Sequence, residues 1–267
     1  MGMIKRRWLQ IFVSGLVLLY LLENALVRTG NPNYVPSVIM IGAFLVPVSF
    51  TAYLYERMPD WEVPFPALAV CFLWGGVLGT VLAGVFEYRV LLSLGFLPLL
   101  GVGLIEEAAK LVVPVVFYLM GRYRSEADGI VLGVATAMGF AALETMGYAF
   151  VILLKSGGNL TALNTVLLAR GILSPAGHAA WTGLVCATLW RERIAAGRPV
   201  VNGRVVGAFV VAVVLHALWD TFNGAGLGPA VYGWPVLRLL GLLVALVSFS
   251  LLIRRVREAS ADKRSSP

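Results

Sequence analysis

Long runs of apolar residues, each about 20 residues in length, recur along the whole sequence and limit what this chain can fold into. A helix needs a run of that length to cross the hydrocarbon core of a bilayer. Hydrophobic residues make up 59% of the chain and charged residues only 13%, which argues against a soluble domain. The runs predict about eight membrane-spanning helices, at residues 8–27, 37–55, 66–86, 99–120, 129–154, 170–190, 205–222 and 232–253.

We therefore predict an all-α, polytopic integral membrane helical bundle. Residues 1–256 are expected to form one transmembrane domain, and residues 257–267 a polar tail. The segment from Val90 to Leu100 contains Pro98 and can be either a re-entrant or an interfacial piece.

The basic residues sort strongly between alternate loops. Most of them, including Arg57, Arg191 and Arg254, fall in loops that the positive-inside rule assigns to the cytoplasm together with both termini. Because these residues lie at helix ends, where they face anionic lipid, the net charge of +7 needs no nucleic-acid partner. The lipid bilayer is the partner that this pattern predicts.

A short set of ionisable side chains lies inside the predicted spans, and it includes both histidines of the chain. A charged group at the bilayer centre costs on the order of 3 kcal/mol, so these groups should face one another. At about 1.5 Å per residue, four helices bring them to one layer near the midplane. The set consists of Glu106, Glu107, Lys110, Glu144, His178, His216 and Asp220.

Local spacing adds detail to this set. Lys110 follows Glu106 by four residues and Glu107 by three, so it can reach either carboxylate. One lysine cannot neutralise two glutamates, and the excess carboxylate can pair with a histidine, bind a cation or carry a proton. His216 and Asp220 are also four residues apart, which allows the carboxylate to orient the imidazole.

Each of these residues also has a purely structural interpretation. Lys110 can be a counter-ion, and Glu144 can hydrogen-bond a hydroxyl such as that of Tyr148. His178 can be a packed histidine, and Asp220 a helix cap or an interfacial group. Taken together, the set favours function.

This chain lacks the residues that most classes of protease require. No HExxH helix is present, and Asp220 is the only candidate for an intramembrane aspartate dyad. Ser174 precedes His178 by four residues, but no glycine-flanked elbow surrounds the serine. A glutamate-based site, with or without a metal, remains.

Three motifs give the chain a family resemblance. Glu106, Glu107 and Lys110 form EExxK, Phe140 and Glu144 form FxxxE, and His216 and Asp220 form HxxxD, with a Gly-His pair ending at His178. In this order the motifs resemble the PrsW family of intramembrane proteases, over roughly residues 100–222. The related prenyl-protein proteases carry EExxxR, FxxxH and HxxxN instead, so the departure favours PrsW.

The resemblance implies an intramembrane endopeptidase. The pair Glu106 and Glu107 would activate a water, and His216 would stabilise the oxyanion or help to bind a metal. Glu144, His178 and Asp220 would complete the polar pocket beside Lys110. Family classification implies a divalent ion such as zinc, with Glu107, Glu144, His178 and His216 as candidate ligands, but these side chains can equally hold water.

The resemblance also implies a substrate and a location. The substrate would be a single-span membrane protein, such as an anti-sigma factor, in the cytoplasmic membrane of a bacterium or an archaeon. Two other classes stay open from the sequence: a proton- or ion-coupled transporter, although no repeated halves are visible, and a non-catalytic scaffold.

Overall fold

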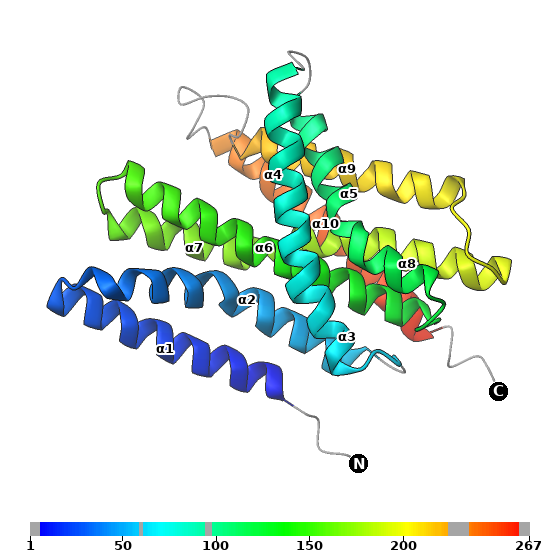
Figure 1. Cartoon of the computed structure of the whole chain (residues 1–267), viewed down its shortest axis with the longest axis horizontal. Helices are drawn as coiled ribbons and strands as arrows, with labels where there is room; N and C mark the ends of the chain where they lie inside the picture. Colours follow the sequence, from blue (N-terminus) through cyan, green and yellow to red (C-terminus); the bar gives the residue numbers. More distant parts are fainter. Residues whose placement is uncertain (1–5, 59–60, 94–97, 224–234, 262–267) are drawn as a thin grey trace. The chain divides into compact units, whose positions relative to one another are not determined.

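The structure, a computed structural model, describes residues 6–58, 61–93, 98–223 and 235–261. Within these ranges every element is helical and none is a strand, which confirms the predicted all-α fold (Figure 1). Among these residues, six helical segments are long and apolar enough to cross a membrane, so the chain is a multi-pass membrane protein. They are Arg7–Thr29, Pro32–Arg57, Phe65–Tyr88, Glu126–Lys155, Gly203–Phe222 and Arg238–Ala261.

The two remaining predicted spans correspond to helices outside this set of six. Helix α5 (Pro98–Leu119) matches the predicted span 99–120, and it carries the EExxK charges. The predicted span 170–190 is wrong in its bounds, because the structure divides this region into α7 (Leu160–Leu173), the 3-10 turn η3 (Ser174–Ala176) and α8 (His178–Ala196). Pro175 lies at the break, where its ring and missing N–H prevent one continuous helix.

The chain divides into two compact units. The first contains Met1–Arg57 and Ala141–Pro175, and the second contains Met58–Phe140 and Ala176–Pro267. Helix α6 (Glu126–Lys155) contributes its first part to the second unit and its last part to the first.

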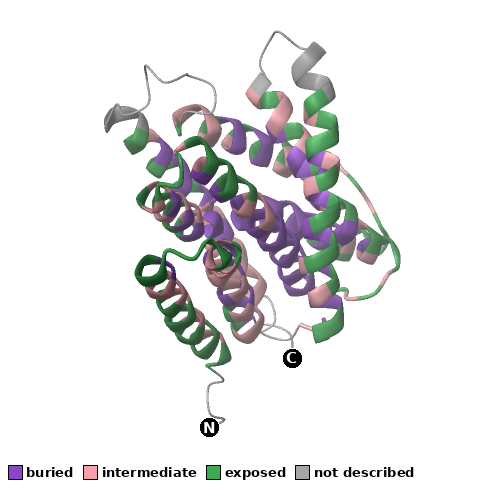
Figure 2. Ribbon diagram, turned by 60° about the vertical axis from the view of Figure 1, so that its left-hand side comes forward, coloured by how far each residue is buried: buried purple, intermediate pink, exposed green. Residues whose placement is uncertain are grey.

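In the first unit, α1 (Arg7–Thr29), η1 (Pro32–Tyr34), α2 (Val35–Arg57), α7 and the last part of α6 share one apolar core. Its buried residues are Leu26, Val38, Ile39, Ala43, Ala149, Leu153, Leu163 and Leu167. Leu26 is the buried residue of α1, and Figure 2 shows this N-terminal helix largely in the colour of exposed residues. Its apolar outer face is suited to contact lipid.

The second unit contains α3 (Phe65–Val70), the π-helical turn η2 (Cys71–Gly75), α4 (Gly76–Ser93), α5, the first part of α6, α8, α9 (Gly203–Phe222) and α10 (Pro235–Ala261). Residues 126–140 of α6 and 178–190 of α8 are buried at every position. A helix that is buried on all sides lies inside its bundle.

Small residues let these buried helices approach closely. A Cβ atom added at Gly129 would lie 2.8 Å from the Trp190 ring, and one at Gly133 would lie 2.7 Å from Cys186, so α6 and α8 touch almost backbone to backbone. Gly139 lies against the Phe72 carbonyl of η2, where no side chain fits. Such contacts are typical of membrane helix packing, and they fix Phe140 of α6 inside the second unit.

For two segments, the predicted bounds can be compared with the structure only in part or differ from it. Of the segment from Val90 to Leu100, α4 includes the residues to Ser93 and α5 those from Pro98, and residues 94–97 lie outside the described part of the chain. Helix α10 continues to Ala261, past residue 257, where the sequence predicts the polar tail to begin.

Candidate active site

Lys110 is the centre of a buried cluster in the second unit. Its Nζ lies 3.0 Å from Glu106 Oε2, 2.8 Å from Glu107 Oε1 and 2.9 Å from His178 Nδ1. The ammonium also lies 4.2 Å from the centre of the Phe140 ring, and the residue is 0% exposed. An ammonium has three hydrogens, so these three acceptors use all of them.

The contact with Lys110 determines the tautomer of His178. An ammonium group has no acceptor, so His178 Nδ1 must accept the hydrogen bond, and a neutral ring then carries its hydrogen on Nε2. His178 is the first residue of α8, and it is buried. Its Nε2–H is therefore a fixed hydrogen-bond donor in a poorly solvated site.

Glu107 has both carboxylate oxygens occupied. Oε1 accepts from Lys110 and lies 2.9 Å from His216 Nδ1, while Oε2 accepts from the Thr182 hydroxyl at 3.1 Å. The residue is 1% exposed. This carboxylate is held by three helices, α5, α8 and α9, and serves to orient the groups around it.

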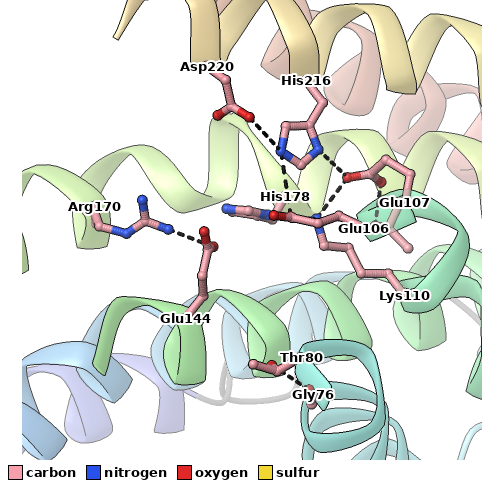
Figure 3. Close-up of polar contacts among 11 residues, drawn as sticks. Gly76, Thr80, Glu106, Glu107, Lys110, Glu144, Arg170, His178, His216 and Asp220 are labelled. Atoms are coloured by element: carbon pink, nitrogen blue, oxygen red, sulfur yellow. Dashed lines mark hydrogen bonds and ion pairs between the residues drawn. The ribbon is translucent and has the colours of Figure 1, made fainter. Parts of the chain in front are cut away.

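His216 connects the two glutamates (Figure 3). Because Glu107 accepts from Nδ1, the lone pair of a neutral His216 lies on Nε2. That nitrogen lies 3.5 Å from Glu106 Oε2 and 3.5 Å from Asp220 Oδ2. The adjacent residues Glu106 and Glu107 thus face opposite ring nitrogens, since neighbouring helical positions diverge by about 100°.

Ring packing holds the two histidines in place. Trp181 stacks on His216 with 4.5 Å between the ring centroids and 20° between the planes, and its Nε1–H donates to Ser248 Oγ of α10 at 2.9 Å. Sequence reasoning missed Trp181, Thr182 and Ser248. A signal existed for two of them, because residues three and four positions after His178 lie on the same helix face.

A glycine brings α5 and α9 together. A Cβ atom at Gly103 would lie 3.0 Å from the Val213 carbonyl oxygen and 3.4 Å from His216 Cβ. Gly103 precedes Glu106 by three residues and lies on the same face of α5. The missing side chain therefore permits the short distances between the glutamates and His216.

Glu144 belongs to the first unit, where its carboxylate lies 2.6 Å from Arg170 Nη2. Arg170 also donates to Thr145 Oγ1 at 3.2 Å and lies 4.2 Å from the Tyr148 ring. Arg170 is not among the site residues that the sequence predicts. Ser174, considered above as a nucleophile, donates its hydroxyl to the Arg170 carbonyl.

The donor set of the second unit has the chemistry of a divalent-metal site. Three carboxylates, those of Glu106, Glu107 and Asp220, surround a single ammonium and two imidazoles. Ligand atoms held about 2.1 Å from one tetrahedral zinc ion lie about 3.4 Å apart. His216 Nε2 lies at about this spacing from one oxygen of Glu106 and one of Asp220, although among the described residues these three ligand atoms are not all close to one another. Glu107 on Nδ1 has the position of an outer carboxylate.

Buried carboxylates and imidazoles gathered between the helices of a multi-pass membrane protein define a candidate site for acid–base chemistry. The family model described as PrsW family intramembrane metalloprotease matches residues 63–252. The chain belongs to this family, which confirms the resemblance found in its motifs. It is an intramembrane endopeptidase, and its substrate is a membrane protein. No curated protein and no solved structure matches the chain.

Proposed function

We propose that this protease hydrolyses its substrate with a water molecule activated by Glu106. The observation that carries the proposal is a difference in hydrogen bonding and exposure between two adjacent glutamates. Glu107 has both oxygens in hydrogen bonds and is 1% exposed, whereas the Glu106 side chain is 8% exposed and faces His216 Nε2 at 3.5 Å. Glu106 is the more accessible of the two carboxylates.

In this mechanism Glu106 accepts a proton from the attacking water as the oxygen bonds to the scissile carbonyl carbon. The carbonyl oxygen then becomes an oxyanion, and the His178 Nε2–H is a donor suited to stabilise it. Glu106 returns its proton to the leaving nitrogen when the carbon–nitrogen bond breaks. Lys110 donates to Glu106 Oε2 and is the counter-ion of this carboxylate.

The residues present fit a divalent ion. Asp220 and His216 Nε2 would help to hold it, and Glu107 would orient the imidazole through Nδ1. When bound, such an ion polarises the carbonyl and makes water a better nucleophile. Glu144 and His178 stay predicted members of the pocket and predicted ligands from the family motifs.

We further propose that the substrate is a single-span membrane protein, such as a membrane-anchored anti-sigma factor. A single helix can enter a site formed between helices and present an unwound segment to water. A glutamate-based site buried within the bilayer needs that segment to come to it, because the catalytic groups lie on buried helices.

The test is cleavage of a panel of single-span reporter proteins in liposomes. We expect wild type to release a fragment from at least one reporter, and Glu106→Gln to abolish release while the protein still inserts and purifies normally. Glu23→Gln, a glutamate change within α1, is the matched control and should cleave normally. Retained cleavage by Glu106→Gln would overturn its assignment as the base.

A further inference from the structure

A groove opens between α8, α9 and α10 at the basic end of the second unit. It has a volume of about 550 Å³, within the range of about 300 to 1,000 Å³ that small-molecule sites occupy. Its apolar walls include Leu184, Val211 and Leu251, one from each helix. Arg191, Arg204 and Arg255 line it as well, again one from each helix, and we call it the arginine groove.

The arginine groove carries more positive than negative charge. Glu258 is shared by three guanidinium groups, those of Arg191 at 3.0 Å, Arg254 at 2.8 Å and Arg255 at 3.1 Å. One carboxylate cannot neutralise three arginines. The side chains of Arg191 and Arg254 are 44% and 76% exposed, so they keep donors available to a ligand.

The other acidic residues at this end do not remove the excess. Glu192 lies 3.2 Å from Arg204 and accepts from Asn202, and Glu126 lies 3.8 Å from Arg255. The groove itself is lined by three arginines and one carboxylate, that of Glu192, and with the neighbouring Arg254, Glu258 and Glu126 four arginines pair with three carboxylates. The Arg204 side chain is 78% exposed, so N–H donors that do not face Glu192 can reach an anion.

The groove is amphipathic along its length. Leu184 precedes Arg191 by seven residues, and Val211 follows Arg204 by seven, so the apolar walls lie about two helical turns from the charged end. Val211 is 41% exposed, which leaves the apolar part open to the bilayer. A charged end at the membrane surface and an apolar end inside it match the two parts of a phospholipid.

We propose that the arginine groove binds one anionic phospholipid. The phosphate group contacts Arg191, Arg204 and Arg255, and an acyl chain lies against Leu184, Val211 and Leu251. Basic pockets between membrane helices hold anionic head groups by this combination of charge and burial. The site is separate from the protease site, and its test does not depend on cleavage.

The test uses native mass spectrometry of the full-length protein in detergent. Phosphatidylglycerol, phosphatidylcholine with the same acyl chains, and inorganic phosphate are titrated separately. We expect tighter binding of phosphatidylglycerol than of phosphatidylcholine, and no displacement of the lipid by inorganic phosphate at equal concentration. Equal affinity for the two lipids, or full displacement by phosphate, would overturn the proposal.

Two kinds of variant distinguish the contribution of the groove's charge to lipid binding from that of its shape, and the first kind removes charge. Arg191→Gln with Arg204→Gln should weaken phosphatidylglycerol binding roughly 30-fold, because each basic residue near an anionic lipid contributes about fivefold. Arg198→Gln, an exposed arginine in the loop after α8 and not part of the groove, is the matched control. It should leave lipid affinity unchanged.

Gly207→Leu tests the groove without changing charge. Gly207 lines the groove, and a Cβ atom there meets nothing within 4 Å, so the helix tolerates a side chain that fills the lipid position. We expect weaker binding of both lipids. Gly84→Leu on α4 places leucine at an equally open position and should bind normally. Normal lipid binding by both Gly207→Leu and the double arginine variant would contradict the assignment.

Discussion

The imidazole of His216 lies flat against the indole of Trp181, with 4.5 Å between the ring centroids. The indole N–H of Trp181 donates a hydrogen bond to Ser248 on α10. The stack between α8 and α9 therefore connects the orientation of His216 to a third helix, α10. Trp181 would act on the site through His216, as a positioning residue. Offset-stacked aromatic pairs contribute about 0.5 to 1.5 kcal/mol beyond the area that they bury.

Replacement of Trp181 should therefore reduce kcat more than it changes KM. We expect Trp181→Phe, which keeps a ring on His216, to retain most activity, and Trp181→Leu to lose about tenfold in kcat, in line with the strength of such a stack. Steady-state cleavage of a reporter measures both constants. A change confined to KM in Trp181→Leu would show that the stack does not position His216.

Ser248→Ala leaves the buried indole N–H of Trp181 without its partner. An unsatisfied buried donor costs about 1 to 3 kcal/mol, so the midpoint of thermal unfolding in detergent should fall. Ser250→Ala changes an exposed serine on the same helix and should leave the midpoint unchanged. Equal unfolding midpoints for the two variants would contradict a stabilising role for the Trp181–Ser248 bond.

Removal of the buried ammonium should be more costly. Lys110→Met leaves Glu106 and Glu107 facing each other without a counter-ion, and loss of one partner of a buried ion pair typically costs about 3 to 5 kcal/mol. Thermal unfolding measures the loss. Adding Glu107→Gln to Lys110→Met should restore part of the stability, and a further decrease in the double variant would argue against charge as the cause.

Gly103→Ala tests the close approach of α5 and α9. The new methyl group would meet the Val213 carbonyl oxygen at 3.0 Å, so the helices must separate slightly and Glu106 moves away from His216. We expect a clear loss of cleavage with little change in unfolding temperature. Gly84→Ala, at an open position on α4, is the control. Full activity in Gly103→Ala would show that these distances are not critical.

Metal content provides a test of the donor set. We expect purified wild-type protein to contain a stoichiometric divalent ion, and removal and restoration of that ion to stop and restore cleavage. His216→Ala should lose the ion, while Glu107→Gln should weaken its binding by about 10- to 100-fold, as outer-shell changes do. Glu23→Gln is the control. If metal-free protein kept full activity, the mechanism would depend on the protein's own side chains and not on a metal ion.

The fold could be predicted from sequence where a helix is long, apolar and uninterrupted. The region around α7 could not, because Leu160–Leu173 is only 14 residues long and runs into the apolar start of α8. A search for spans of about 20 residues merges such short helices with their neighbours. The break at Pro175 depends on one residue, and Pro can also be accommodated inside a membrane helix.

The site was partly visible because a charge in a membrane span is costly and therefore informative. That argument identified Glu106, Glu107 and Lys110. It could not distinguish the two glutamates, since their roles depend on which nitrogen of His216 each one faces. Thr182 was not visible either, because a neutral hydroxyl within an apolar helix carries no comparable cost and usually bonds to its own backbone.

The surroundings of Lys110 also explain why this position holds a lysine. The three N–H bonds of an ammonium spread tetrahedrally from one nitrogen, whereas the donors of a guanidinium lie in one plane. Here the acceptors approach that nitrogen from two helices, Glu106 and Glu107 from α5 and His178 from α8. Arginine would keep the charge but could not point its donors in these directions. Geometry, as well as charge, therefore selects lysine at this position.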